Sequence, residues 1–254
     1  MTIHIKNLEE QQKMREAGKL AAATLDMLRP HVVAGISTEA LDKLVHDFTL
    51  AHNAVPATLG YHGFPASCCI SINDIACHGI PDKTILQDGD IVNIDVTPKL
   101  DGWHGDTSKM FLIGDVSDED RELCEIAHGA MWAGIDAIEA GRDIKSIGRA
   151  ISLYLHDKPA TIARDFCGHG TGLVFHEKPQ ILHFAFFKDL GKIVPGMTFT
   201  IEPIINAGVP NTITSTEDDW TVTTADGCKS AQWEHTILIL EDGIEILTLR
   251  EEEK

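Results

Sequence analysis

The chain has 254 residues, of which 43% are hydrophobic and 24% are charged, a composition typical of a soluble globular protein with one large core. Its 39 acidic and 21 basic residues give a formal net charge of −18, which argues against stable binding to nucleic acid. No stretch approaches the roughly 18 consecutive apolar residues of a membrane span, and the polar N-terminus lacks the pattern of a secretory signal. We therefore expect a cytoplasmic protein with no membrane association.

The cysteines indicate a reduced protein. All six are spread along the chain without a CxxC pair. In a reducing compartment this spacing favours free, mostly buried thiols over disulfides.

The chain opens with two expected helices. Apolar residues recur at helical spacing over 7–29 and 37–53, and Ser37 is a suitable N-cap for the second of these segments. From 69 to 113 the pattern changes to β-rich runs separated by Gly, Asp and Pro turns.

The same order of elements then occurs a second time. A second helical pair is expected over about 118–139 and 144–157, with Ser117 as N-cap, and strand-like segments fill 162–248. The order helix, helix, strands is therefore repeated once.

Local similarity between the two halves supports an internal repeat. The segment DGDIVNIDV at 88–96 matches PGMTFTIEP at 195–203, which puts Asp95 and Glu202 at equivalent positions.

We interpret residues 1–254 as a single domain with pseudo-twofold symmetry, with halves of about 1–115 and 116–254. No Gly-, Ser- or Pro-rich linker divides the chain. The expected fold class is α/β (α+β), with antiparallel sheet and the two helical pairs outside it.

Two aspartates in the first half are unusual for strand residues. Asp is depleted in strands, yet Asp95 lies within the apolar run IVNIDV. Asp101-Gly102 is a hairpin signal, and a loop on these two residues pairs Asp106 with Thr97, on the same face as Asp95. A loop on Leu100-Asp101 would instead pair Asp95 with Asp106 directly. Either register places two carboxylates on one face, where they would repel unless a cation lies between them.

The second half supplies three further candidate ligands. Glu202 lies within the apolar run FTIEPII, and Glu234 opens the apolar run EHTILIL. Burying such a charge unpaired costs several kcal/mol. His169 lies in the glycine-rich segment GHGTG, where the backbone can approach a ligand closely. Four carboxylates and a neutral imidazole suit two divalent cations of the Mn, Fe, Co or Zn type, without choosing among them.

Five motifs occur in order along the chain: CHGIP at 77–81, NIDVTPKLDGWHGDTSKMF at 93–111, GHGTGLVFHEKP at 168–179, TFTIEP at 198–203, and Trp-Glu-His at 233–235. With these motifs the chain resembles the type I methionine aminopeptidases of the short bacterial form, over essentially its whole length. The resemblance implies the pita-bread fold and removal of the initiator methionine from polypeptides whose second residue is small.

The resemblance also implies roles for individual residues. Two divalent metals would be held by Asp95, Asp106, His169, Glu202 and Glu234. His78 and His176 would contact the substrate peptide and act in catalysis, and Glu202 would carry the proton. The methionine pocket would be formed by Thr58, Tyr61, His62, Cys69, Phe175 and Trp220. Thr58 departs from the family, which commonly has Cys at this position.

The implied partners are the N-termini of nascent or newly made polypeptides, met by a monomeric enzyme. A transient contact with the ribosome is left open, although the loop between Glu202 and Glu234 is acidic, with Lys229 as its only base.

Two other readings remain at this point. A prolidase or an aminopeptidase that cleaves before proline has a motif close to GHGTGLVFHE, although such enzymes usually carry a further N-terminal domain. A binding protein that kept the fold and lost the chemistry would be expected to lose metal ligands, whereas this sequence retains all five.

Overall fold

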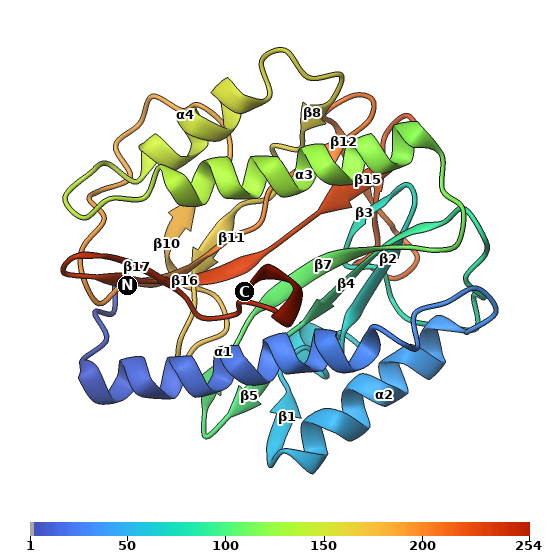
Figure 1. The fold of residues 1–254 in the computed structure, drawn as a ribbon, viewed down its shortest axis with the longest axis horizontal. Coiled ribbons are helices and arrows are strands. Elements are labelled where there is room, and N and C mark those ends of the chain that lie inside the picture. The colour runs from blue at the N-terminus through green and yellow to red at the C-terminus, as the bar shows by residue number, and fades with distance from the viewer. Residues whose placement is uncertain (1–2) are drawn as a thin grey trace.

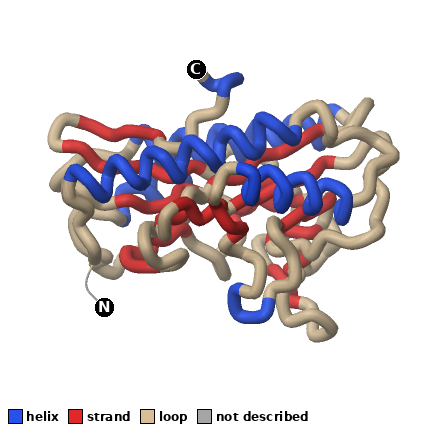
Figure 2. The backbone as a smooth tube through the Cα atoms, turned by 90° about the horizontal axis from the view of Figure 1, so that it is seen from below, coloured by secondary structure: helices blue, strands red, loops and turns tan. Residues whose placement is uncertain are grey.

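The computed structural model describes residues 3–254. Helices α1 (Leu8–Leu28) and α2 (Thr38–Ala51) lie along one side of the molecule, and α3 (Asp118–Asp136) and α4 (Lys145–Tyr154) lie along the other (Figure 1). Figure 2 shows α1 and α2 crossing in front of the strands. Both predicted helical pairs are confirmed to within a few residues at each end.

Side-chain caps fix where the helices begin. Ser37 accepts a hydrogen bond from the Ala40 N–H, and Ser117 accepts one from the Asp120 N–H, as the sequence predicts. Asn7 and Glu10 add a capping box at the start of α1, which the sequence analysis did not identify.

The strands are short and their pairing is antiparallel. The first half contains β1 (Ala54–Pro56), β2 (Cys69–Ile72), β3 (Ile75–Cys77), β4 (Ile91–Val96), β5 (Pro98–Leu100), β6 (Trp103–His104) and β7 (Thr107–Leu112). The second half contains β8 (Thr161–Ile162), β9 (Gly168–Gly170), β10 (Glu177–Ile181), β11 (Thr198–Ile201), β12 (Ile204–Asn206), β13 (Thr212–Thr214), β14 (Val222–Thr224), β15 (Ser230–Gln232), β16 (His235–Leu240) and β17 (Gly243–Ile246).

Corresponding strands pair in the same way in the two halves. The first half has a sheet with strand order β2-β4-β7, and the second has one with order β10-β9-β11-β16-β17. The two halves meet beside β7, where the Glu234 N–H donates to the Ser108 carbonyl at 3.1 Å and the Thr236 hydroxyl donates to the Asp106 carbonyl at 2.8 Å. Strand β7 of the first half and strand β16 of the second half therefore lie next to each other.

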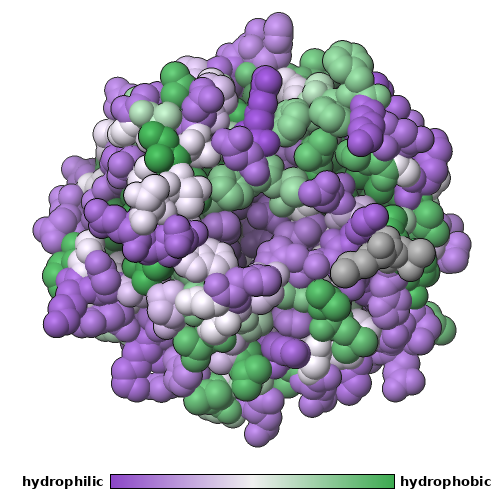
Figure 3. Space-filling model, turned by 180° about the vertical axis from the view of Figure 1, so that it is seen from behind, coloured by the Kyte–Doolittle hydropathy of each residue, from purple (hydrophilic) through white to green (hydrophobic). Residues whose placement is uncertain are grey.

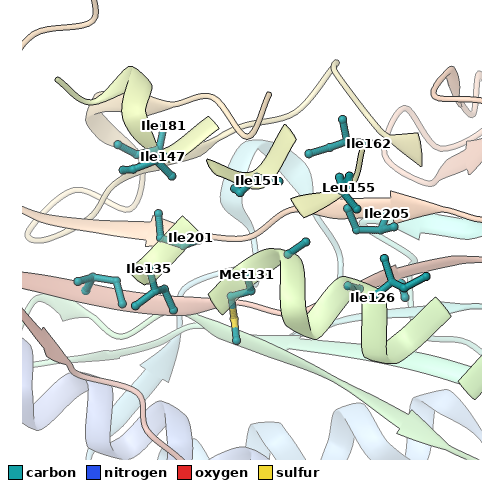
Figure 4. Close-up of a cluster of buried hydrophobic side chains, with 14 of the residues drawn as sticks. Ile126, Met131, Ile135, Ile147, Ile151, Leu155, Ile162, Ile181, Ile201 and Ile205 are labelled. Atoms are coloured by element: carbon teal, nitrogen blue, oxygen red, sulfur yellow. The ribbon is translucent and has the colours of Figure 1, made fainter. Parts of the chain in front are cut away.

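Each helical pair covers a hydrophobic core of its own. Met131 and Ile135 on α3 and Ile147 and Ile151 on α4 pack with Ile201 of β11 (Figure 4). A second core lies beneath α1 and α2, and contains Leu25, Leu41, Val45, Ile94 and Phe111. These two cores hold the strands rigidly, and with them the side chains on the opposite face.

Two expectations from composition can be compared with the structure. The six cysteines are free, and four of them are buried, as predicted. Over residues 3–254, the helices are all too short or too polar to cross a bilayer.

Candidate active site

A carboxylate–histidine cluster lies where the two halves of the chain meet. One ligand atom from each of Asp106, His169 and Glu234 lies within 4.8 Å of the others. Asp106 and Glu234 are only 3% and 2% exposed. Acidic side chains are almost never this deeply buried without a partner, and a bound cation would stabilise this cluster.

The hairpin register decides where Asp106 points. Leu100 pairs with Trp103, so the loop falls on Asp101-Gly102, the first of the two predicted alternatives. Both loop residues have positive φ, as a two-residue hairpin turn requires. The Thr97 hydroxyl then donates to Asp106 Oδ1 at 2.8 Å and fixes the carboxylate.

His169 presents a free nitrogen to the carboxylates. Its Nδ1 donates to the Gly170 carbonyl at 3.0 Å, which leaves Nε2 as the acceptor atom. Nε2 lies 3.5 Å from Asp106 Oδ2 and 3.5 Å from Glu202 Oε1. Burial lowers the pKa of His169 to about 4, so at neutral pH the imidazole is uncharged and can act as a metal ligand.

Glu202 and Asp95 border the same cavity. Glu202 follows β11, and its Oε1 accepts a hydrogen bond from the Thr200 hydroxyl at 2.6 Å. Asp95 lies on β4, and its Oδ1 is buried with no hydrogen-bond partner among residues 3–254. A buried carboxylate oxygen left without a donor is a costly arrangement that a bound cation would relieve.

Burial and the closeness of the four carboxyl groups shift their pKa values upward. Burial raises the pKa of Asp106 to about 7. Burial first, and neighbouring carboxylates second, raise the pKa values of the other three acids well above their ordinary range: Asp95, Glu202 and Glu234. The orphaned oxygen, the crowded carboxylates and the neutral imidazole together fit divalent metal ions.

A cavity of about 330 Å³ opens beside the cluster, of a size typical of small-ligand sites. Figure 3, which views the molecule from behind, shows a hollow near the centre of this face with a hydrophilic floor. The cavity wall includes all five predicted metal ligands, both predicted catalytic histidines, and five of the six predicted pocket residues: Thr58, Tyr61, Cys69, Phe175 and Trp220.

His62 is the exception among the predicted pocket residues. It does not belong to the cavity wall formed by the described residues, and its ring lies edge-on against Tyr61 at 4.4 Å between centroids. The chain turns at this point, because His62 has a positive φ of 46° within the short 3₁₀ turn Tyr61–Gly63. The adjacent motif residue Tyr61 faces the cavity, while the structure does not bring His62 to its wall.

His176 and Tyr61 form a pair at the cavity wall. His176 Nδ1 lies 2.9 Å from the Tyr61 hydroxyl. Burial raises the pKa of Tyr61, so the phenol keeps its proton and can donate it to Nδ1. Burial, reinforced by His169, lowers the pKa of His176 to about 3. His176 is therefore neutral, and with Nδ1 as acceptor it carries its proton on Nε2.

The acidic loop between Glu202 and Glu234 contributes Trp220 to the cavity wall. Asp218 Oδ1 accepts hydrogen bonds from the Trp220 and Thr221 N–H groups, both at 2.8 Å. The Trp220 ring lies at 5.2 Å from Phe64 and 5.9 Å from His78. Asp218 thus has a structural role in placing Trp220, which the acidic composition of the loop did not indicate.

Several cavity residues were missed by the sequence analysis: Phe64, Cys77, Asp165, Phe166, Cys167, Ile204 and Gln232. Three of them were within reach of a sequence argument, because Cys77 precedes His78 in CHGIP, Cys167 precedes the GHG segment, and Gln232 lies two residues before Glu234.

Comparison with known proteins agrees with this site. Residues 12–241 match the model of metallopeptidase family M24. The chain is 49% identical over 249 residues to a methionine aminopeptidase of Rickettsia prowazekii, an alignment covering 98% of this chain and 96% of that relative. It is 47% identical over 255 residues to a methionine aminopeptidase of Escherichia coli, covering 100% and 96%. The chain belongs to the methionine aminopeptidase family.

Solved structures give the same result for the fold. The crystal structure of the Rickettsia prowazekii methionine aminopeptidase matches with a TM-score of 0.96 and 48% identity, covering 98% of this chain and all of that one. A prolidase from Pyrococcus furiosus matches with a TM-score of 0.76 and 21% identity, and this chain covers 66% of it. The second likeness shows the shared pita-bread fold, which confirms the predicted fold class.

Proposed function

We propose that this chain hydrolyses the first peptide bond of newly made polypeptides that begin with methionine followed by a small residue. Release of N-terminal methionine is the activity of its family. The observation that carries the proposal is the cluster of Asp106, His169 and Glu234 in the wall of a cavity of about 330 Å³.

Five residues would hold two divalent metal ions, of the Co, Mn, Fe or Zn type. Asp95, Asp106 and Glu234 would contact one or both ions, while His169 and Glu202 would complete the second site. Bound there, the ions would lower the pKa of a water to near 7 and polarise the scissile carbonyl. The neutral imidazole and the unpartnered Asp95 oxygen support this assignment.

The remaining steps belong to side chains of the protein. Glu202 accepts the proton of the attacking water and returns it to the leaving amide nitrogen, so the proton count balances. Its position is supported by hydrogen bonds from Thr200 at 2.6 Å and from Gln232 at 3.4 Å. His176 donates a hydrogen bond from its Nε2–H to the oxyanion of the tetrahedral intermediate and keeps its proton, and His78 contacts the peptide amide or carbonyl.

The enzyme would act as a cytoplasmic monomer. Its substrates are soluble polypeptide N-termini, and a net charge of −18 opposes any lasting contact with ribosomal RNA. Contact with the ribosome would therefore be transient.

Cleavage of Met-Ala peptides against Ala-Pro peptides tests the proposal. The metal-loaded protein is expected to release methionine from Met-Ala-Ser and to leave Ala-Pro-Ser intact. The likeness to prolidases is confined to the fold, because those matches are about 20% identical. Preferential cleavage before proline, by the same preparation, would refute the methionine assignment.

The second residue of the substrate should be small. With the amine and the carbonyl both held at the carboxylate cluster, that residue lies against the glycine-rich His169 segment and the His78 loop. A steric clash of a few kcal/mol there costs about a hundredfold in rate. We expect kcat/KM for Met-Ala, Met-Gly and Met-Ser peptides to exceed that for Met-Lys and Met-Leu by at least this factor. Equal values for Met-Ala and Met-Lys would contradict the crowded second position.

Thr58 should tune the choice of the first residue. Its Oγ1 is buried at the cavity wall and has no hydrogen-bond partner in the described part of the chain, so it is free to donate to a polar atom of the substrate side chain. Such a bond is worth about 0.5–1.5 kcal/mol, or roughly 2- to 13-fold. We expect Thr58→Val to lower the preference for O-methylhomoserine over norleucine by that factor, measured as kcat/KM on peptides that differ only in their first residue. An unchanged ratio would show that the hydroxyl does not contact the substrate.

A further inference from the structure

Arg250 is the largest of the fully buried side chains among residues 3–254, with 0% of its surface exposed. It lies just after β17 and immediately before the short 3₁₀ turn Glu251–Glu253. A fully buried guanidinium is rare and costly unless partners satisfy it; within residues 3–254 both Nη atoms of Arg250 have partners, whereas its Nε has none. The role proposed above for the metal ligands does not use it.

The two ends of the guanidinium group contact different parts of the molecule. Nη1 donates to the Thr107 hydroxyl at 3.0 Å, to the Ser108 carbonyl at 3.1 Å and to the Glu234 carbonyl at 3.4 Å. Nη2 donates to Glu253 Oε1 at 2.7 Å. The group also lies over the Trp233 ring, with 5.3 Å from Cζ to the ring centroid.

The Nη1 partners are the backbone neighbours of the two deepest candidate ligands. Thr107 and Ser108 follow Asp106 at the start of β7 in the first half of the chain. Glu234 immediately precedes β16 in the second half. The Thr107 hydroxyl completes the link, because it donates to the Glu234 carbonyl at 2.7 Å while it accepts from Arg250. One side chain therefore ties together the two strands that bring Asp106 and Glu234 within 4.8 Å.

The charge of Arg250 is balanced on the side away from the cavity. Despite burial, the neighbouring His128 and His235 and the charge of Arg250 hold the pKa of Glu253 well below its usual range. Arg250 Nη2 lies 2.7 Å from Glu253 Oε1, so the permanently charged guanidinium is the positive partner of Glu253. Toward the cavity, Arg250 contributes directed N–H donors fixed by the planar fork of the guanidinium.

We propose that Arg250 is a positioning residue for the metal centre. By joining the backbones beside Asp106 and Glu234 it sets the distance between these carboxylates, and with it the affinity of the site for divalent metal. This inference rests on the proposed function for the identity of the ligands. Outer partners that orient metal ligands typically contribute about 10- to 100-fold to metal affinity.

A double-mutant cycle on metal affinity tests the inference. Mn²⁺ binding to the chelator-treated full-length protein would be measured by calorimetry for the wild type, Arg250→Met, Thr107→Val and the double variant. We expect Arg250→Met to weaken Mn²⁺ binding at least about 10-fold. Thr107→Val should weaken it in the wild-type background and add little once Arg250 is gone, because both residues act through the same link.

Arg15→Met is the matched control. Arg15 on α1 also pairs with a carboxylate, Glu245 at 2.8 Å, but the pair is partly exposed, and the side-chain hydrogen bonds of Arg15 within residues 3–254 go to Glu245. Arg15→Met should leave Mn²⁺ affinity unchanged. Combined with Thr107→Val, it should give the same Mn²⁺ affinity as Thr107→Val alone. Wild-type affinity in Arg250→Met, or additivity within the Arg250–Thr107 cycle, would overturn the inference.

Arg250→Lys covers the case in which Arg250→Met does not fold. Lysine keeps the charge beside Glu253, but a single ammonium cannot reach Thr107, Ser108 and Glu253 together. We expect a folded protein, by near-UV circular dichroism, that binds Mn²⁺ at least about 10-fold more weakly than the wild type. Wild-type affinity in this variant would overturn the inference while leaving the proposed function intact. If the wild-type protein itself bound no Mn²⁺, or bound it without cleaving Met-Ala, the proposed function would fail instead.

Discussion

Glu234→Ala should remove both the metal and the activity. Glu234 is 2% exposed, lies beside Asp106 and His169, and would contact one or both ions. The substitution removes a negative charge that balances the charge of the metal ions. Because the position is buried, water cannot easily replace the lost carboxylate as a metal ligand. We expect less than about one thousandth of the wild-type kcat/KM on Met-Ala-Ser, equivalent to more than about 4 kcal/mol of transition-state stabilisation.

Metal content separates this result from simple misfolding. Elemental analysis of folded Glu234→Ala should show fewer than two metal ions per chain, and Asp95→Ala should behave in the same way. Glu241→Ala, at an exposed acid just after β16, is the control and should keep both metal and activity. Two tightly held ions in either active-site variant would rule out the proposed ligand set. Chelation of the wild type should likewise abolish activity, and a divalent transition metal should restore it.

His176→Ala should lower kcat far more than it raises KM. The Tyr61 hydroxyl at 2.9 Å from Nδ1 leaves Nε2–H as the donor aimed into the cavity. A donor directed at the developing oxyanion acts mainly in the transition state, and removing one typically costs about 10²- to 10³-fold in kcat. Steady-state kinetics on Met-Ala-Ser at saturating metal would measure both constants.

His169→Ala provides the comparison for this prediction. The two rings lie 4.1 Å apart, yet only His169 turns a free Nε2 toward Asp106 and Glu202. His169→Ala should therefore lose metal, whereas His176→Ala should bind metal as the wild type does. If His176→Ala changed KM alone, His176 would be a ground-state contact and its catalytic role would be wrong.

Much of the fold followed from local rules that operate over a few residues. Ser37 and Ser117 were predictable as caps because a serine before an amphipathic segment can bond its first free N–H groups. The Asp101-Gly102 turn was predictable because two successive positive φ values favour these residue types. With the turn in place, strand pairing counts back to Thr97 and Asp106, so one pair of carboxylates could be assigned to a common face.

Features that depend on contacts between distant segments could not be predicted from the sequence. His62 and Tyr61 are neighbours in the motif, but the backbone reverses at His62 and only Tyr61 faces the cavity. Asp218 is one of several acids in the loop between Glu202 and Glu234, and its role in holding Trp220 depends on the folded path of that loop. Membership in the methionine aminopeptidases confirms the predicted family, while the roles of the individual site residues stay predictions.

The sequence by itself indicated the four helices, the β-rich segments, the repeated order of helices and strands, and which residue types were available for metal chemistry. These properties depend on periodicity, capping and turn preference, which act between residues close in the chain. Only the tertiary structure decided which of the acids converge, and how strongly burial raises their pKa values, because both depend on packing between distant segments. Arg250 is an example of a residue whose role could not be predicted from the sequence. In sequence it is one base near an acidic end, whereas in the folded chain it links Thr107 to Glu234 across the two halves, a contact that exists only once both cores have formed.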